Sequence, residues 1–291
     1  MTRSAKADGD SAPHATLVQA AHAPYAEWLT PHAYLPGVER LNACAREAAL
    51  ALPDGRALSF VAAPRLRPSA LEFERRIHDR GEIYVREGSE HDVWNALAWL
   101  RFGATKSAVN ALHVAQGDSA SGNKRGPCRD AATLLDESGV IVACDDVELV
   151  DLWRRYRWRA AFWDLRDDVA AKMRVVAIGH GLLVKLAAPY PSITAAALVL
   201  PIAAQALPSK PSELATRLDG HAARWLIARG AELTTRDLLP LPLSALPGWC
   251  AEELSADAFD DGSVFRERDR LTPRSRGSRG TADELGARSH Q

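Results

Sequence analysis

The sequence predicts an α+β fold in which helices cover a small β-sheet. Segments with helical apolar spacing alternate along the chain with short apolar runs of strand length, which is typical of mixed folds. The chain has 291 residues, of which 47% are hydrophobic and 25% charged, as in ordinary globular proteins. It contains no GxGxxG, Walker A, GxSxG or HExxH motif, which argues against dinucleotide-binding, P-loop, α/β-hydrolase and zincin proteins.

We expect a single globular domain from residue 16 to residue 265, because no sharp boundary divides that range. Residues 1–15 are polar and are expected to form a flexible leader. Residues 266–291 are rich in Arg, Gly and Ser and hold almost no apolar side chains, so we expect a disordered tail.

The first elements are a helix, a strand and a mixed segment. Helical apolar spacing predicts a helix over residues 38–52. The turn dipeptide Asp54-Gly55 then leads into a strand candidate over residues 56–63. Residues 71–85 are expected to be partly helical and partly extended, with Gly81 as the helix stop.

Two helices are expected between residues 90 and 114. Ser89 followed by Asp92 is a capping-box signature, so the first helix should begin near Glu90. Gly103 should end it, and Thr105 can cap the second helix. The short linker would make the two helices antiparallel neighbours.

A β-hairpin is expected over residues 131–144, because two apolar runs flank the polar turn that ends at Gly139. In this interpretation Asp136 and Glu137 form the turn, and Asp146 or its neighbour caps the next helix.

The remaining elements are a long helix, a strand, a further helix and an extended arm. The long helix is expected over residues 159–186, followed by a strand over 193–200, a helix over 211–230 and a proline-rich arm over 238–250.

Composition excludes several functional classes. The four cysteines form no CxxC pair, which argues against zinc fingers and a disulfide framework and favours a reducing cytosol. The formal net charge of −1 gives no basic surplus, so nucleic-acid binding is not favoured. The amino terminus lacks a signal-peptide core, and prolines interrupt the one long apolar stretch, residues 187–207. We therefore expect a soluble cytoplasmic protein that has no membrane segment.

The helices over residues 90–114 each carry a polar stripe. His91 and Asn95 share one face of the first helix, and Lys106 and Asn110 share one face of the second. Asparagine costs up to about 0.7 kcal/mol in a helix interior relative to alanine, and substrate binding would explain that cost. The alternatives are that each Asn holds a loop carbonyl and that Lys106 faces solvent.

The loop KRGPCRD places Arg125 and Arg129 around a Gly-Pro turn. Guanidinium groups on such a loop suit the recognition of carboxylate or phosphate. The alternative is a structural salt bridge between Arg129 and Asp130.

His180 lies between Gly179 and Gly181 inside the expected long helix. Each interior glycine costs about 1 kcal/mol relative to alanine, which the close approach of a backbone or a ligand would explain. His180 is then either a site residue or a core histidine bonded to a carbonyl.

Four stretches in order along residues 38–266 resemble one bacterial family, known only as domain of unknown function 3025. They are HDVWNALAWLRFGATKSAVNALH, RGPCRDAATLLDESGVIVACDD, FWDLRDD followed by GHGLLVKLAAPYPSITAAALVL, and LPLPLSALPGWC before DDGSVFR. The resemblance implies a soluble bacterial protein in which these stretches belong to one domain. It implies no established activity, cofactor or catalytic residue.

The leading functional hypothesis is an enzyme, a hydrolase or transferase, that acts on a small anionic substrate. His91 and His180 would be the catalytic acid and base. The expected substrate-binding residues are Asn95, Lys106, Asn110, Arg125 and Arg129. The alternative is a non-catalytic protein that binds an acidic partner or nucleic acid.

A third possibility is a metal ion on His91 and His180, although the sequence assigns no metal ligand. The sequence identifies neither a cofactor nor an oligomeric state.

Overall fold

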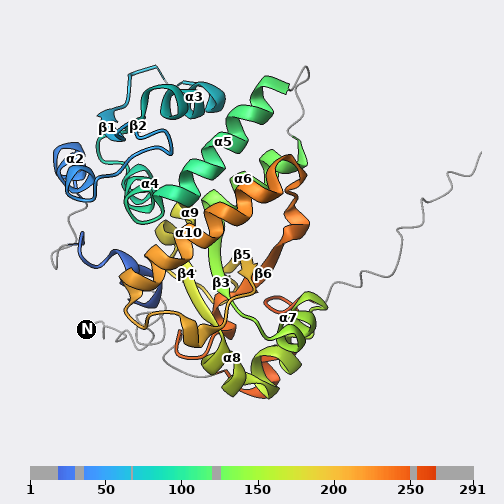
Figure 1. Cartoon of the computed structure of the whole chain (residues 1–291). Coiled ribbons are helices and arrows are strands. Elements are labelled where there is room, and N and C mark those ends of the chain that lie inside the picture. Colours follow the sequence, from blue (N-terminus) through green and yellow to red (C-terminus); the bar gives the residue numbers. More distant parts are fainter. Residues whose placement is uncertain (1–18, 30–35, 67, 120–125, 250–253, 267–291) are drawn as a thin grey trace, which may run out of the picture.

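The computed structural model describes residues 19–29, 36–66, 68–119, 126–249 and 254–266 (Figure 1). The expected leader over residues 1–15 lies outside these residues, as does the expected tail apart from Arg266.

The main sheet has four strands in the order β4-β3-β5-β6. They are β3 (Gly139–Ala143), β4 (Arg174–Ala177), β5 (Thr194–Leu200) and β6 (Leu238–Pro242). Strand β3 runs parallel to β5 and antiparallel to β4, while β6 is antiparallel to β5. All five residues of β3 are buried, so the sheet forms the centre of the core. Together with the helices this sheet confirms the α+β class.

A second, two-stranded sheet lies beside α4, away from the main sheet. Strands β1 (Ser59–Ala62) and β2 (Glu82–Val85) are parallel, and α3 (Ala70–Arg80) connects them. Ser69 and Glu72 form the capping box of α3, and Gly81 ends the helix with a φ of 68°. Both the strand candidate after Asp54-Gly55 and the stop at Gly81 are confirmed.

The larger helices are α4 (Glu90–Arg101), α5 (Gly103–Ser119), α6 (Pro127–Ser138) and α10 (Pro211–Arg229). Helices α6 and α10 contact the main sheet, and α10 also packs along α5 (Figure 1). The shorter helices are α2 (Val38–Glu47), α7 (Val147–Arg154), α8 (Arg166–Lys172) and α9 (His180–Lys185). Helix α2 packs on β1, and α9 packs on α4 and α6.

The expected hairpin over residues 131–144 is wrong, because residues 127–138 form α6 and only β3 follows. Gly126 and Pro127 provide a favourable helix start. The buried residues Cys128, Ala131, Ala132 and Leu135 repeat at i, i+3, i+4 and i+7, which is the spacing of one helical face. Asp136 and Glu137 therefore lie in the last turn of a helix and not in a hairpin turn.

The expected long helix over residues 159–186 is also wrong. A short π-helical segment (Ala160–Asp164) and α8 are followed by strand β4, and α9 begins only at His180. The apolar residues of RVVA pair with β3 in the main sheet. Burial in a sheet therefore decides the conformation of a segment whose apolar run is compatible with either structure.

Helices α4 and α5 are separated by a single non-helical residue, Phe102, and α5 leaves α4 at an angle (Figure 1). The expected antiparallel pair is therefore wrong, because one residue is too short for an antiparallel turn. Thr105 does not cap α5 either. The carboxylate of Asp219, on α10, accepts hydrogen bonds from the backbone N–H groups of Ala104 (3.1 Å) and Thr105 (2.7 Å).

Replacing Asp219 by alanine is expected to lower the free energy of unfolding by about 1–2 kcal/mol, the usual cost of removing a helix cap. Chemical denaturation of the full chain would measure the change. Asp145→Ala is the matched control: its side chain is exposed, so its effect should stay within about 0.5 kcal/mol. Equal losses in the two variants would contradict the capping role of Asp219.

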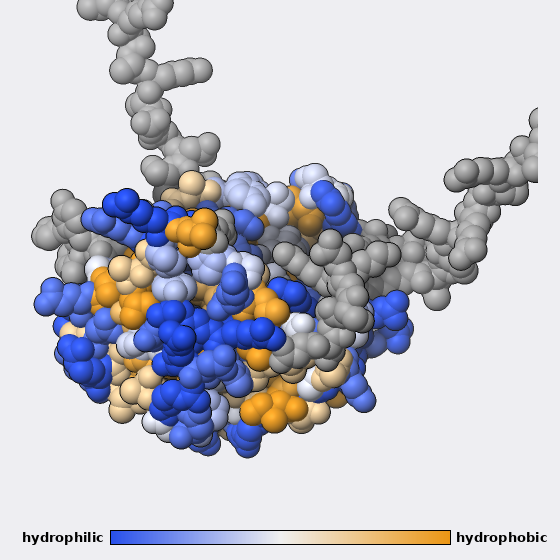
Figure 2. Space-filling view, turned by 90° about the horizontal axis from the view of Figure 1, so that it is seen from above, coloured by the Kyte–Doolittle hydropathy of each residue, from blue (hydrophilic) through white to orange (hydrophobic). Residues whose placement is uncertain are grey.

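The surface seen in Figure 2 mixes hydrophilic residues with small, separate groups of hydrophobic ones. Within the described residues, no helix combines the length and the apolarity needed to cross a membrane. Cys44, Cys128 and Cys144 are buried free thiols, while Cys250 lies outside the described residues.

Candidate functional site

Three side chains from three helices meet at one point beside the main sheet. His91 lies in the first turn of α4, Glu137 in the last turn of α6, and His180 is the first residue of α9. The Glu137 Oε2 atom is 3.4 Å from His91 Nε2 and 3.2 Å from His180 Nε2. Among the described residues, they are the one group of three or more His, Cys, Asp and Glu side chains whose ligand atoms lie close enough to hold a metal ion.

The main sheet brings Glu137 and His180 together. Glu137 lies two residues before β3, and His180 lies three residues after β4. Because β3 and β4 are antiparallel, the beginning of one strand meets the end of the other. The backbone N–H of Gly179 donates to the carbonyl of Gly139 (2.9 Å), which closes this junction.

Glycines allow the close approach at this junction. A Cβ atom on Gly179 would lie 2.3 Å from the backbone nitrogen of Gly139. A Cβ atom on Gly181 would lie 2.0 Å from Oε1 of Glu137. The sequence-based expectation that the glycines beside His180 permit a close approach is thus confirmed, although both lie at the start of a short helix.

Each histidine has a second carboxylate near its other ring nitrogen. The distance from Nδ1 of His91 to Oδ1 of Asp92 is 3.5 Å. The distance from Nδ1 of His180 to Oδ2 of Asp136 is 3.6 Å. The two imidazole rings lie edge to face with centroids 4.5 Å apart. Carboxylates placed in this way orient metal-binding histidines in many proteins.

The charged groups in this cluster shift one another's pKa values. Hydrogen bonds with Asp92 and with Glu137 raise the pKa of His91 to about 9. Hydrogen bonds with His180 and His91 hold the pKa of Glu137 well below its ordinary range. Burial acts to raise the pKa of Asp92, but the hydrogen bonds from Arg86 outweigh it and the pKa is lowered. All three groups are therefore charged at neutral pH in the absence of a ligand.

Lys106 is buried next to the cluster and binds two of the neighbouring side chains. Its side chain is only 3% exposed, and its ammonium donates to Oδ1 of Asn95 (2.8 Å) and to the carboxylate of Asp136. Burial alone would raise the pKa of Asp136, but the adjacent Lys106 and His180 lower it. Lys106 thus keeps Asp136 ionised beside His180.

Asn110 is bound to a different carboxylate. Its Nδ2 donates to the backbone oxygen (2.9 Å) and to Oε2 (2.7 Å) of Glu74, on α3. Burial raises the pKa of Glu74 to about 7 even though the bond from Asn110 acts against the shift. Glu74 is thus a carboxyl group that can exchange a proton near neutral pH.

The cluster opens into a cavity of about 530 Å³. The polar and charged residues of its lining are Arg65, Ser69, Glu74, Tyr84, Arg86, His91, Asp92, Asn95, His113, Arg129, Thr133, Asp136, Glu137 and His180. Arg129 is half-buried in the first half of α6, and its guanidinium makes no hydrogen bond or ion pair with another described residue. Its charge acts on Glu74 across the cavity.

The structure brings most of the residues selected from the sequence to one place. His91, Asn95, Arg129 and His180 line the cavity. Lys106 and Asn110 lie directly behind it, beside Asn95 and Asp136. Arg125 lies outside the described residues.

The sequence pattern does not select Glu137, Asp136 or Glu74 as site residues. It predicts a hairpin turn for the first two, and Glu74 belongs to a charged segment in which no residue stands out. The helical spacing of the apolar residues in α6 was the signal that could have placed Glu137 and Asp136 on a helix.

Residues 58–269 match a family model whose description is "Protein of unknown function (DUF3025)". The searches of curated proteins and of solved structures found no match.

Proposed function

The chain belongs to the DUF3025 family, and we propose that it is a metal-dependent hydrolase acting on a small anionic substrate. The observation that carries the proposal is the geometry of His91, Glu137 and His180. Their facing atoms are 3.2 and 3.4 Å apart. Ligands bound tetrahedrally to Zn²⁺ at about 2.0–2.1 Å lie about 3.3 Å from one another.

The chemistry of the donors suits this ion. Two imidazoles and one carboxylate are a common ligand set of catalytic zinc, which leaves a further position for water. When bound, the ion would supply an activated water molecule for attack on the substrate. Asp92 and Asp136 would accept from the Nδ1 atoms of His91 and His180 and hold the two rings in place.

Arg129 and Glu74 would supply the remaining functions. The guanidinium of Arg129 would neutralise the anionic group of the substrate, because it makes no hydrogen bond or ion pair with another described residue. Glu74, with a pKa of about 7, would accept a proton from water and return it to the leaving group. A cavity of about 530 Å³ has a suitable size for a small molecule.

The convergence of His91, Asn95, Arg129 and His180 on one cavity favours an enzyme over a non-catalytic binding protein. A binding surface for an acidic partner or nucleic acid would spread its arginines over an outer face.

Elemental analysis and an activity assay on the purified full chain test the proposal. We expect about one equivalent of zinc per chain, as in a three-ligand catalytic site. Chromogenic anionic esters, both phosphate and carboxylate esters, should be hydrolysed by the protein as purified. A chelator should abolish the activity, and added Zn²⁺ should restore it.

His91→Ala and His180→Ala should both lose zinc and activity. His78→Ala is the matched control, because His78 also precedes an aspartate and is exposed to a similar extent, 49% against 45% for His91. It should keep both properties. Substoichiometric metal, or hydrolysis that survives the chelator, would refute the metal-dependent mechanism. Bound iron would instead favour an oxygen-dependent reaction, since two histidines and a carboxylate also bind Fe(II).

A further inference from the structure

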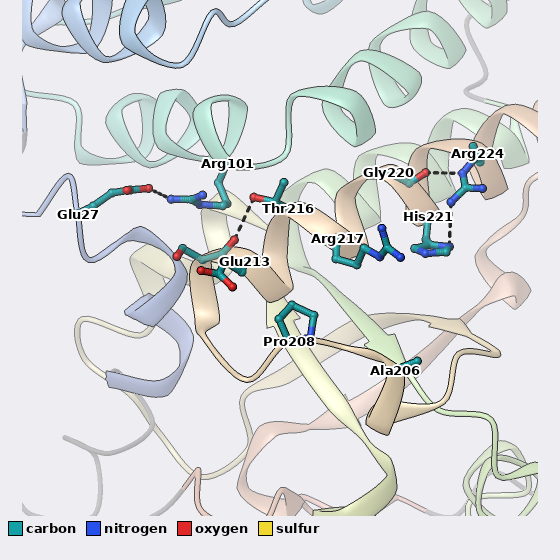
Figure 3. Close-up of a pocket in the computed structure, with 11 residues that line it drawn as sticks. Glu27, Arg101, Ala206, Pro208, Glu213, Thr216, Arg217, Gly220, His221 and Arg224 are labelled. Carbon is teal, nitrogen blue, oxygen red and sulfur yellow. Dashed lines mark hydrogen bonds and ion pairs between the residues drawn. The ribbon is translucent and has the colours of Figure 1, made fainter.

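A second cavity, separate from the one beside His91, Glu137 and His180, lies along the exposed side of α10. It is an open groove of about 720 Å³ between α10 and the segment over residues 206–208, with Arg101 and Glu27 at one end (Figure 3). Arg217, His221 and Arg224 lie at its other end (Figure 3). None of its lining residues belongs to the cavity described above.

The groove has an excess of positive charge. Its two acidic residues are both paired: Glu27 with Arg101, and Glu213 with Lys210 at 3.2 Å. Arg217 is exposed and makes no ion pair with another described residue. Burial lowers the pKa of His221, and the positive charges of Arg224 and Arg217 lower it further. An anion entering the groove would therefore meet arginine donors that no described carboxylate occupies.

The donors are also oriented. Nε of Arg224 donates to the carbonyl of Gly220 (3.0 Å), and its Nη2 lies 3.1 Å from Nδ1 of His221. A guanidinium has donors only, so Nδ1 of His221 accepts and Nε2 of the neutral ring carries the proton. His221 thus adds an N–H donor to the groove, and its ring helps to hold the guanidinium of Arg224.

The packing of the fold does not explain why residue 220 is a glycine. It lies inside the 19-residue helix α10, where glycine is less favourable than every residue except proline. A Cβ atom placed on it would meet no other atom within 4 Å, so packing does not require a glycine there. Arg217, Gly220, His221 and Arg224 share one face at i, i+3, i+4 and i+7. The missing side chain leaves the surface between the two arginines bare.

We propose that this groove binds a small ligand through a diphosphate group that lies over Gly220 between Arg217 and Arg224. Seven residues of helix span about 10 Å, so the two flexible side chains can each reach one of two adjacent phosphates from opposite sides. The planar fork of a guanidinium matches two phosphate oxygens at once. The N–H of His221 supplies a further donor between them.

Calorimetric titration of the full chain with inorganic pyrophosphate tests this site. Arg217→Gln and Arg224→Gln should each weaken binding about tenfold, and the affinity should fall with added salt because the arginines are exposed. Arg159→Gln is the matched control, since it removes one exposed arginine on a different element. It should bind pyrophosphate like the unmodified chain.

The variant Gly220→Leu distinguishes a loss of ligand binding from a loss of stability. Leucine is a much better helix former than glycine and has room at this position, so the thermal unfolding midpoint should rise. Its side chain would cover the bare surface, so pyrophosphate binding should be lost. Unchanged affinity in Gly220→Leu, or in both arginine variants, would overturn the proposal.

Two further experiments test where pyrophosphate binds and whether the ligand is a small molecule or a nucleic acid. Arg129→Gln removes the expected anion-binding residue of the other cavity and should bind pyrophosphate normally; if it loses binding while Arg217→Gln keeps it, pyrophosphate binds in the cavity of Arg129 and the groove proposal fails. A single-stranded oligonucleotide should bind no more tightly than pyrophosphate. Tighter, length-dependent binding of the oligonucleotide would replace the small ligand with a nucleic acid.

Discussion

Glu137→Gln is expected to lower the affinity of the protein for Zn²⁺ by at least about a hundredfold. Replacing residues that only orient metal ligands costs about 10- to 100-fold, and a direct ligand should cost more. Glutamine keeps the size of the side chain but removes the charge, and a neutral amide is a weak ligand for zinc. Competition with a chromogenic chelator would measure the affinity, and hydrolytic activity should fall in parallel.

Two variants make this result specific. Glu148→Gln removes an exposed carboxylate on α7 and should leave the Zn²⁺ affinity unchanged. Asp136→Asn should give an intermediate loss, because Asp136 faces Nδ1 of His180 and acts through that ring. If Glu137→Gln bound Zn²⁺ as tightly as the unmodified chain, Glu137 would not be a ligand.

Lys106→Met is expected to lower the free energy of unfolding by about 3 kcal/mol, the cost of breaking a buried ion pair from one side. Methionine fills a similar volume, so the loss comes mainly from Asp136, which would remain largely buried without its cation. Chemical denaturation of the full chain would measure the change. Lys185→Met is the matched control, since Lys185 is exposed and should contribute within about 0.5 kcal/mol.

The loss in Lys106→Met should be larger at pH 8 than at pH 5. In the unmodified chain the pKa of Asp136 is lowered, so this carboxylate contributes stability above its unfolded pKa. Without Lys106, burial would raise the pKa of Asp136, and stability would then decrease as the pH rises through that value. Lys106→Met/Asp136→Asn should recover part of the loss. If the loss of stability were independent of pH and the double variant recovered none of it, the unpaired charge of Asp136 would not be its cause.

The candidate site was only partly predictable from the sequence. His91 and His180 stand out because each is a titratable side chain in an apolar or glycine-rich surrounding. Glu137 does not stand out, because a carboxylate near a glycine is equally compatible with a hairpin turn. Its assignment to the site needs α6, which the spacing of Cys128, Ala131 and Leu135 favours but which only the burial of that face distinguishes from a hairpin.

The role of Lys106 could not be predicted from the sequence alone either. Its position on a helical stripe with Asn110 predicts a residue that faces the substrate. In the structure α5 leaves α4 at an angle, and the ammonium of Lys106 is buried against Asn95 and Asp136. The direction of a side chain on a helix can be read from the sequence, but the neighbour it meets depends on how the helices cross.

Features that depend on residues close along the chain could be predicted from the sequence alone. The start of α4 at Ser89, the start of α7 at Asp145 or Asp146 and the end of α3 at Gly81 are examples, because each rests on a hydrogen bond or a dihedral angle within one turn. Which distant segments meet depends on tertiary packing. The pairing of β3 with β4 brings Glu137 to His180, and the packing of α4 on α9 adds His91 to them. Such contacts depend on the burial of whole strands and helix faces, which no local pattern specifies.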